Sequence, residues 1–127
     1  MTVLARPSPL VHDVIGCAIE VHRTLGPGLL ESSYQACFAQ ELAERRIVVA
    51  REVPVPLCYK GVRIDCSYRA DLIVAEVLLI EVKSVDRLLP VHTAQVMTYL
   101  RLLDLHQGLI FNFNARTLRE GLRNILM

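Results

Sequence analysis

The stretch YRADLIVAEVLLIEVK, residues 68–83, places charged side chains inside otherwise apolar strand sequence. The aliphatic run that begins at Val77 is typical of a strand buried on both faces, yet Glu81 and Lys83 interrupt it. Burying a charge is costly unless the charge is paired, hydrogen-bonded or bound to a metal. Because side chains alternate along a strand, Glu81 and Lys83 point to the same face, about 6.6 Å apart at roughly 3.3 Å per residue. We therefore expect a polar site on that face.

The register of the preceding strand decides whether a second acid, Asp71, meets Glu81. A two-residue loop would pair Val74 with Val77 and send Asp71 to the opposite face, but the sequence lacks the Asn-Gly or Gly-X that such a turn prefers. A longer connection of three or five residues, or a bulge, places Asp71 opposite Glu81 with Cβ atoms about 5 Å apart. We predict this second register. Two carboxylates at that spacing repel unless a cation lies between them, and hard oxygen ligands suit Mg²⁺ or Mn²⁺.

Length and composition limit the classes of protein that fit. At 127 residues the chain is predicted to form one domain, residues 1–127, which buries roughly two thirds of its unfolded surface. Hydrophobic residues make up 53% and charged residues 21%, so we expect a homodimer contact to cover part of the apolar surface. The net charge of +1 excludes a global basic field, and any contact with nucleic-acid phosphate must be local.

The sequence predicts neither membrane insertion nor a soft-metal centre. No apolar run approaches the ~18 residues of a membrane span, and residues 1–10, MTVLARPSPL, lack the charged start and apolar core of a signal peptide. We therefore expect a cytoplasmic protein. The four cysteines contain no C-x-x-C pair, which argues against zinc or an iron–sulfur cluster and predicts buried, reduced thiols.

The remaining periodicity predicts helices around a mixed sheet. Ser8-Pro9 is typical of a helix start, and residues 25–28, LGPG, end that helix. The expected elements are helices over 9–25, 29–46 and 90–103, strands over 47–55, 62–68 leading directly into 69–74, 77–83 and 108–113, and a short amphipathic C-terminal helix with Leu118, Leu122 and Ile125. This order, α, α, β, β, β, α, β, α, predicts an α/β (α+β) fold with a mixed central sheet flanked by helices.

The second predicted helix carries a candidate carboxylate. Glu31 and Tyr34 lie three residues apart on one side of it, with Phe38 a turn further on, and the two aromatic rings are expected to pack inward. Glu31 is then either a site carboxylate at the edge of a buried face or a first-turn glutamate favoured by the helix dipole. The glycine loop over 25–28 fits a sharp turn better than a phosphate-binding loop, because no Gly-Lys-Ser/Thr follows.

The helix over 90–103 carries a polar stripe. His92, Gln95 and Tyr99 recur at i, i+3 and i+7, whereas Val96 and Leu100 are expected to face the core. Such a stripe either faces solvent or serves a site, and the residues alone leave both interpretations open.

These residues, in this order, resemble a known set of motifs. Asp71 followed by Glu81-Val82-Lys83 at the end of the next strand is similar to the D…(D/E)-x-K motif of the PD-(D/E)XK nuclease superfamily, although Ala70 stands in place of the proline. Residues 28–34, GLLESSY, resemble the GxxExxY family, which is placed in that superfamily. E-x-K alone is a weak signal, whereas the ordered set that includes Gln95-x-x-x-Tyr99 is specific. The resemblance runs from about Val14 to Asn112.

The resemblance implies a restriction-endonuclease-like αβββαβ core and metal-dependent hydrolysis of phosphodiester bonds in nucleic acid, with DNA favoured over RNA. The implied catalytic residues are Glu31, Asp71, Glu81 and Lys83, the implied ligands of Mg²⁺ or Mn²⁺ are Glu31, Asp71, Glu81 and the Val82 carbonyl, and the implied substrate-positioning residues are Gln95 and Tyr99. Lys83 would orient the attacking water and offset developing negative charge. The alternative is a noncatalytic nucleic-acid-binding or protein-interaction module on the same fold, which the small size and near-neutral charge favour.

Overall fold

The computed structural model describes residues 8–127 and contains three α-helices and seven strands in that range. The elements are α1 (Pro9–Leu25), α2 (Glu31–Glu44), β1 (Val49–Pro54), β2 (Leu57–Tyr59), β3 (Val62–Ile64), β4 (Arg69–Val74), β5 (Leu78–Lys83), α3 (Pro90–Leu103), β6 (Gln107–Asn112), the 3₁₀ helix η1 (Leu118–Gly121) and β7 (Leu122–Leu126).

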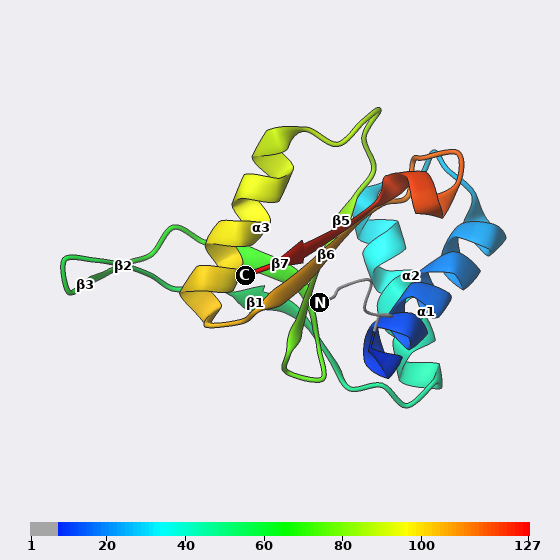
Figure 1. Cartoon of the computed structure of the whole chain (residues 1–127). Coiled ribbons are helices and arrows are strands. Elements are labelled where there is room, and N and C mark those ends of the chain that lie inside the picture. The colour runs from blue at the N-terminus through cyan, green and yellow to red at the C-terminus, as the bar shows by residue number, and fades with distance from the viewer. Residues whose placement is uncertain (1–7) are drawn as a thin grey trace, which may run out of the picture.

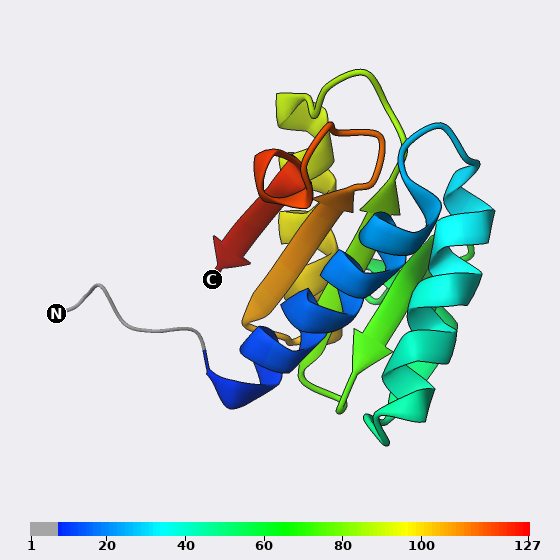
Figure 2. The ribbon, with the colours of Figure 1, turned by 90° about the vertical axis from the view of Figure 1, so that its right-hand side faces the viewer.

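A five-stranded mixed sheet forms the centre of the fold, in the order β1-β4-β5-β6-β7. Neighbouring strands are antiparallel except β5 and β6, which are parallel and joined through α3. The helices α1 and α2 cover one face of this sheet and α3 covers the other (Figures 1 and 2). The predicted mixed sheet flanked by helices, with its αβββαβ order, is therefore confirmed.

Strand β5 contributes side chains to two separate hydrophobic cores. Leu78, Ile80 and Val82 pack in the core beneath α1 and α2, whereas Leu79 packs in the core beneath α3. This division explains the continuous apolar run, since both faces of the strand are covered. By the same alternation, Glu81 and Lys83 point to the α3 side.

The connection between β4 and β5 has the predicted longer form. Val74 pairs with Leu78 across a three-residue loop, and Leu72 pairs with Ile80. The pairing ends at Leu72 and Ile80, and the next position along this register would bring together Asp71 and Glu81. Two loop residues, Ala75 and Glu76, have positive φ angles of 51° and 62°, so the turn forms without the glycine that usually marks such conformations.

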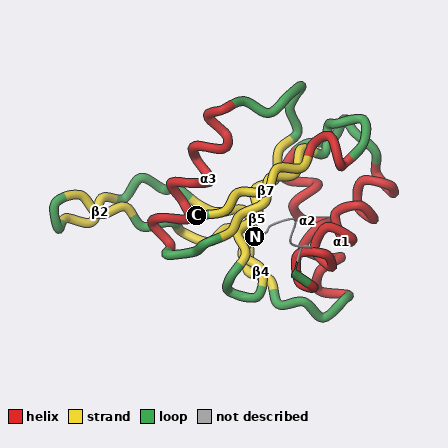
Figure 3. Tube along the Cα trace, viewed as in Figure 1, coloured by secondary structure: helices red, strands yellow, loops and turns green. Residues whose placement is uncertain are grey.

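The strand predicted over residues 69–74 is confirmed as β4, but the strand predicted over residues 62–68, leading directly into it, is wrong beyond Ile64. Within residues 62–68 only Val62–Ile64 is strand, and it pairs with β2 in a separate two-stranded hairpin before the chain enters the main sheet at Arg69. The break is local: the Asp65 carboxylate accepts a hydrogen bond from Ser67 N at 3.0 Å, and Ser67 has a φ of 57°. Figure 3 shows the β2–β3 hairpin projecting away from the sheet and its helices.

The predicted C-terminal helix is also wrong. The chain forms η1 and then β7, which pairs antiparallel with β6. The three-to-four spacing of apolar residues in so short a segment does not distinguish a helix from a strand. The free edge of β6 supplies backbone hydrogen bonds that decide the outcome, and Gly121 permits the close approach, because a Cβ there would lie 2.3 Å from the Asn112 oxygen.

One smaller prediction is wrong, and another concerns residues that the structure describes only in part. All four cysteines are free, but only Cys17 is buried, whereas Cys37, Cys58 and Cys66 are exposed. Most of the segment considered as a signal peptide, residues 1–7, lies outside the described residues. Between residues 8 and 127, no helix combines the length and apolar character that crossing a bilayer would require.

Candidate active site

Asp71 and Glu81 meet where β4 and β5 diverge. The Asp71 Oδ2 atom accepts a hydrogen bond from Val82 N at 2.8 Å, so a side chain takes the place of a backbone partner at this point. Glu81 is only 4% exposed, and its Oε1 atom is buried without a hydrogen-bond partner among the described residues. A buried acceptor without a partner is unusual in a folded protein and indicates a site for a ligand, ion or proton.

Burial, reinforced by the adjacent Asp71, raises the pKa of Glu81 to about 9, and the nearby Lys83 opposes this rise only in part. The free protein therefore carries Glu81 in its uncharged form at neutral pH. Two adjacent carboxyl groups need either a shared proton or a cation between them. Two neighbouring carboxyl groups, one of which has an oxygen without a partner, fit a divalent ion such as Mg²⁺ or Mn²⁺.

A buried glutamine holds the Asp71 carboxylate from the other side of the sheet. The Gln35 side chain on α2 donates to Asp71 Oδ1 at 3.2 Å and accepts from the Arg51 guanidinium at 3.3 Å. Gln35, which is 7% exposed, is not among the site residues predicted from the sequence. Its spacing of four residues from Glu31 is the signal that could have revealed it, since residues i and i+4 share one helix face.

Lys83 ends β5 on the same face as Glu81. Its side chain is half-buried and forms no ion pair within residues 8–127. Its carbonyl accepts from Phe113 N at 2.9 Å, on the β6 side of the strand. Because backbone groups of successive residues point alternately to the two neighbouring strands, the Val82 carbonyl points to the β4 side, toward Asp71.

Glu31 binds the end of β5 through a backbone amide. Its Oε2 atom accepts from Ser84 N at 3.0 Å, and the Ser84 hydroxyl donates to Leu29 O at 2.7 Å. The Tyr34 hydroxyl accepts from Leu29 N at 3.1 Å and donates to Gly26 O. The segment that resembles GxxExxY therefore clamps the glycine loop against the residue that follows Lys83.

The three predicted carboxylates do not form one preformed group. In the part of the chain that the structure describes, no three His, Cys, Asp or Glu side chains are placed to share an ion. Asp71 and Glu81 come together, whereas Glu31 lies at the same end of β5 with its carboxylate engaged by Ser84.

The polar stripe of α3 divides between the site and the helix start. Gln95 Nε2 donates to the Tyr99 hydroxyl at 3.1 Å, and Tyr99 is only 5% exposed. Burial, and secondarily the charge of Glu81, raises the pKa of Tyr99, which places this hydroxyl within the electrostatic reach of the acidic pair. His92 instead caps the helix, because its Nδ1 accepts from Leu89 N at 3.0 Å.

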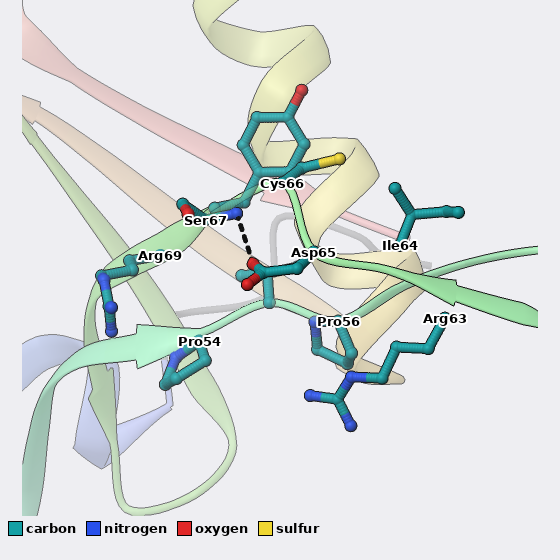
Figure 4. A pocket seen from close by; sticks show the side chains of 10 residues that line it. Pro54, Pro56, Arg63, Ile64, Asp65, Cys66, Ser67 and Arg69 are labelled. Atoms are coloured by element: carbon teal, nitrogen blue, oxygen red, sulfur yellow. Dashed lines mark hydrogen bonds between the residues drawn. The ribbon is translucent and has the colours of Figure 1, made fainter.

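A pocket of about 440 Å³ lies at the base of the β2–β3 hairpin rather than over the acidic pair (Figure 4). Its lining runs along residues 54–56 and 63–69. One lining residue, Tyr68, has its ring centroid 6.0 Å from that of Tyr99. Tyr68 therefore links the pocket lining to α3, the helix that carries Tyr99.

A mixed αβββαβ sheet with two carboxyl groups and a lysine at the ends of adjacent strands defines a domain of the restriction-endonuclease-like class. The sequence matches the family model for the PD-(D/E)XK nuclease superfamily over residues 8–125, and the chain belongs to that superfamily. Comparison with curated proteins and with solved structures gives no match.

Proposed function

We propose that this protein is a nuclease of the GxxExxY family that hydrolyses phosphodiester bonds in nucleic acid, DNA in preference to RNA, with Mg²⁺ or Mn²⁺. Membership of the PD-(D/E)XK nuclease superfamily supports a nuclease-like function. The observation that carries the proposal is the buried Glu81 oxygen without a partner, next to Asp71. A purely structural glutamate at this position would be expected to have its oxygens hydrogen-bonded.

The side chains of Asp71 and Glu81 and the Val82 carbonyl would hold the ion. When bound, it would supply Lewis acidity at the phosphoryl oxygen and lower the pKa of an attacking water. Gln35 keeps Asp71 oriented for this task through its 3.2 Å hydrogen bond. Glu31, predicted as a further ligand, would have to exchange its hydrogen bond with Ser84 N for the ion.

Lys83 would orient the attacking water and offset the negative charge that develops on the phosphoryl group. Its ammonium forms no ion pair with a carboxylate among the described residues, although its charge lowers the pKa of the nearby Glu81. The ammonium is therefore available for this role. Gln95 would contact the substrate from α3, and the buried Tyr99 would hold the Gln95 amide in place.

The direct test is cleavage of single-stranded and duplex DNA and RNA with Mg²⁺ or Mn²⁺, comparing wild type with Glu81→Gln and Lys83→Met. We expect each variant to lose at least about 100-fold in rate, as is typical when a group that stabilises transition-state charge is removed. Glu44→Gln, an exposed carboxylate on α2, is the matched control and should retain wild-type activity. Cleavage that survives both site substitutions would come from a contaminant and would leave the noncatalytic binding module as the better description.

A further inference from the structure

We infer that the β2–β3 hairpin, together with the pocket at its base, is an arm that grips duplex DNA by entering the major groove. The inference rests on the proposed function in that nucleic acid is the substrate, and it names which form is bound and by which surface. The arm consists of residues 57–69.

The hairpin of the arm is separate from the main sheet, which the chain enters at Arg69. Its two strands form their own sheet, and Tyr59, Val62 and Ile64 are 64%, 59% and 41% exposed. An isolated two-stranded hairpin is only marginally stable in water, because neither face is covered. Figure 1 shows it reaching past α3 into solvent, so both faces are open to a partner.

The charge of the arm complements a phosphate backbone. Residues 57–69 contain Lys60, Arg63 and Arg69 but only one acid, Asp65, in a chain whose net charge is only +1. None of the three basic side chains forms an ion pair within residues 8–127. The Asp65 carboxylate is already engaged by Ser67 N. The local positive charge is therefore not neutralised by the arm itself.

The base of the arm contacts α3, the helix that covers the Glu81 face of the sheet. In Figure 4, Arg69 lies beside Pro54 and Arg63 beside Pro56, so two guanidinium groups border the pocket. Tyr68, also in the pocket lining, contacts Tyr99 of α3 with a centroid distance of 6.0 Å. A nucleic acid held by these arginines would thus lie against the wall that separates the pocket from Glu81.

The shape of the arm favours duplex DNA. The major groove of B-DNA is about 12 Å wide and about 8.5 Å deep and admits a two-stranded β-ribbon. Strands of three residues, such as β2 and β3, extend roughly 10 Å at about 3.3 Å per residue, which matches the depth of the groove. The major groove of A-form RNA is too narrow for side chains to read.

Binding is measured with the full chain carrying Glu81→Gln, so that the probe is not cut. Fluorescence anisotropy with a labelled 20-base-pair DNA duplex compares this parent with the parent that also carries Arg63→Ala and Arg69→Ala. We expect the arm variant to bind at least tenfold more weakly and to lose about 1.8 from the slope of log K against log salt, since two phosphate contacts are removed. Arg119→Ala, an exposed arginine far along the chain, should stay within twofold of the parent.

Several outcomes would contradict the inference that the arm binds duplex DNA. Equal affinity of parent and arm variant, or equal affinity for duplex DNA and for duplex RNA of the same sequence, would do so. Tighter binding of single-stranded DNA would refute groove insertion. A shift from dimer to monomer on Tyr59→Ser, with DNA affinity unchanged, would identify the hairpin as a contact between copies of the chain. Circular dichroism confirms that the variants fold.

Cleavage separates this inference from the proposed function. If wild type cuts DNA, Glu81→Gln does not, and the arm variant binds normally, the proposed hydrolysis is supported and DNA binding by the arm is refuted. If the arm variant loses affinity but no protein cuts any substrate, DNA binding by the arm is supported and the proposed hydrolysis is refuted. Where both hold, the arm variant without Glu81→Gln should raise KM about tenfold and leave kcat within twofold of wild type.

Discussion

Replacing Glu81 by glutamine should change how the stability of the protein depends on pH. The Glu81 carboxyl has a pKa of about 9 in the folded protein, against 4.5 for a free glutamate. Between these two values the folded state keeps a proton that the unfolded state has lost. The stability that the Glu81 carboxyl contributes is therefore fully present below about pH 4.5 and is lost as the pH rises toward about 9.

The magnitude follows from proton linkage. One proton difference corresponds to about 1.4 kcal/mol per pH unit, so the wild-type protein should lose about 3 kcal/mol of unfolding free energy between pH 5.5 and pH 7.5 from this group alone. Glutamine keeps the shape and the polar character but does not titrate. As the pH rises, the unfolding free energy of Glu81→Gln should therefore increase steadily relative to that of wild type.

Urea unfolding at pH 5.5, 6.5, 7.5 and 8.5, with EDTA to remove metal ions, measures this difference. The m-value should be the same for both proteins, so that the midpoints compare directly. Glu44→Gln, which removes an exposed carboxylate, should follow the wild-type profile. Parallel profiles for wild type and Glu81→Gln would show that Glu81 does not hold the proton, and the interpretation of the acidic pair would fail.

Three further predictions concern the ion, the support of Asp71 and the C-terminal strand. Mn²⁺ should raise the thermal midpoint of wild type more at pH 8.5 than at pH 6.5, because the ion must displace the Glu81 proton, and should leave Glu81→Gln unchanged; an equal shift in both proteins would contradict a site at this carboxyl. Gln35→Leu should cost about 1 to 3 kcal/mol in urea unfolding and lower the cleavage rate, because it deprives the Asp71 carboxylate of its 3.2 Å amide donor, whereas an unchanged rate would remove Gln35 from the site. Gly121→Ala should lower the thermal midpoint by more than about 5 °C, since its Cβ would lie 2.3 Å from the Asn112 oxygen, a backbone atom that no rotamer change can move; a midpoint within about 2 °C of wild type would show that the chain relaxes there.

Part of the site follows from local rules and is therefore readable from the residues. The alternation of side chains along β5 puts Glu81 and Lys83 on one face whatever the rest of the chain does. The helix start at Ser8-Pro9 is equally local, with the Ser8 hydroxyl accepting from Val11 N at 3.2 Å. The order of the core elements from α2 to β6 and a connection longer than two residues between β4 and β5 needed no information beyond spacing and turn chemistry.

The remaining features depend on partners distant in sequence. Glu31 meets Ser84 across 53 residues and Gln35 meets Asp71 across 36, and no local pattern specifies such contacts. The chain after Gly121 forms a strand because the edge of β6 supplies backbone hydrogen bonds, whereas its apolar spacing fits a helix as well as a strand. The sequence alone indicated Asp71, Glu81 and Lys83 as candidate site residues and the strands that hold them. Only tertiary packing decided which of them share a buried space, because burial and long-range pairing set the pKa of Glu81 and the partners of Asp71.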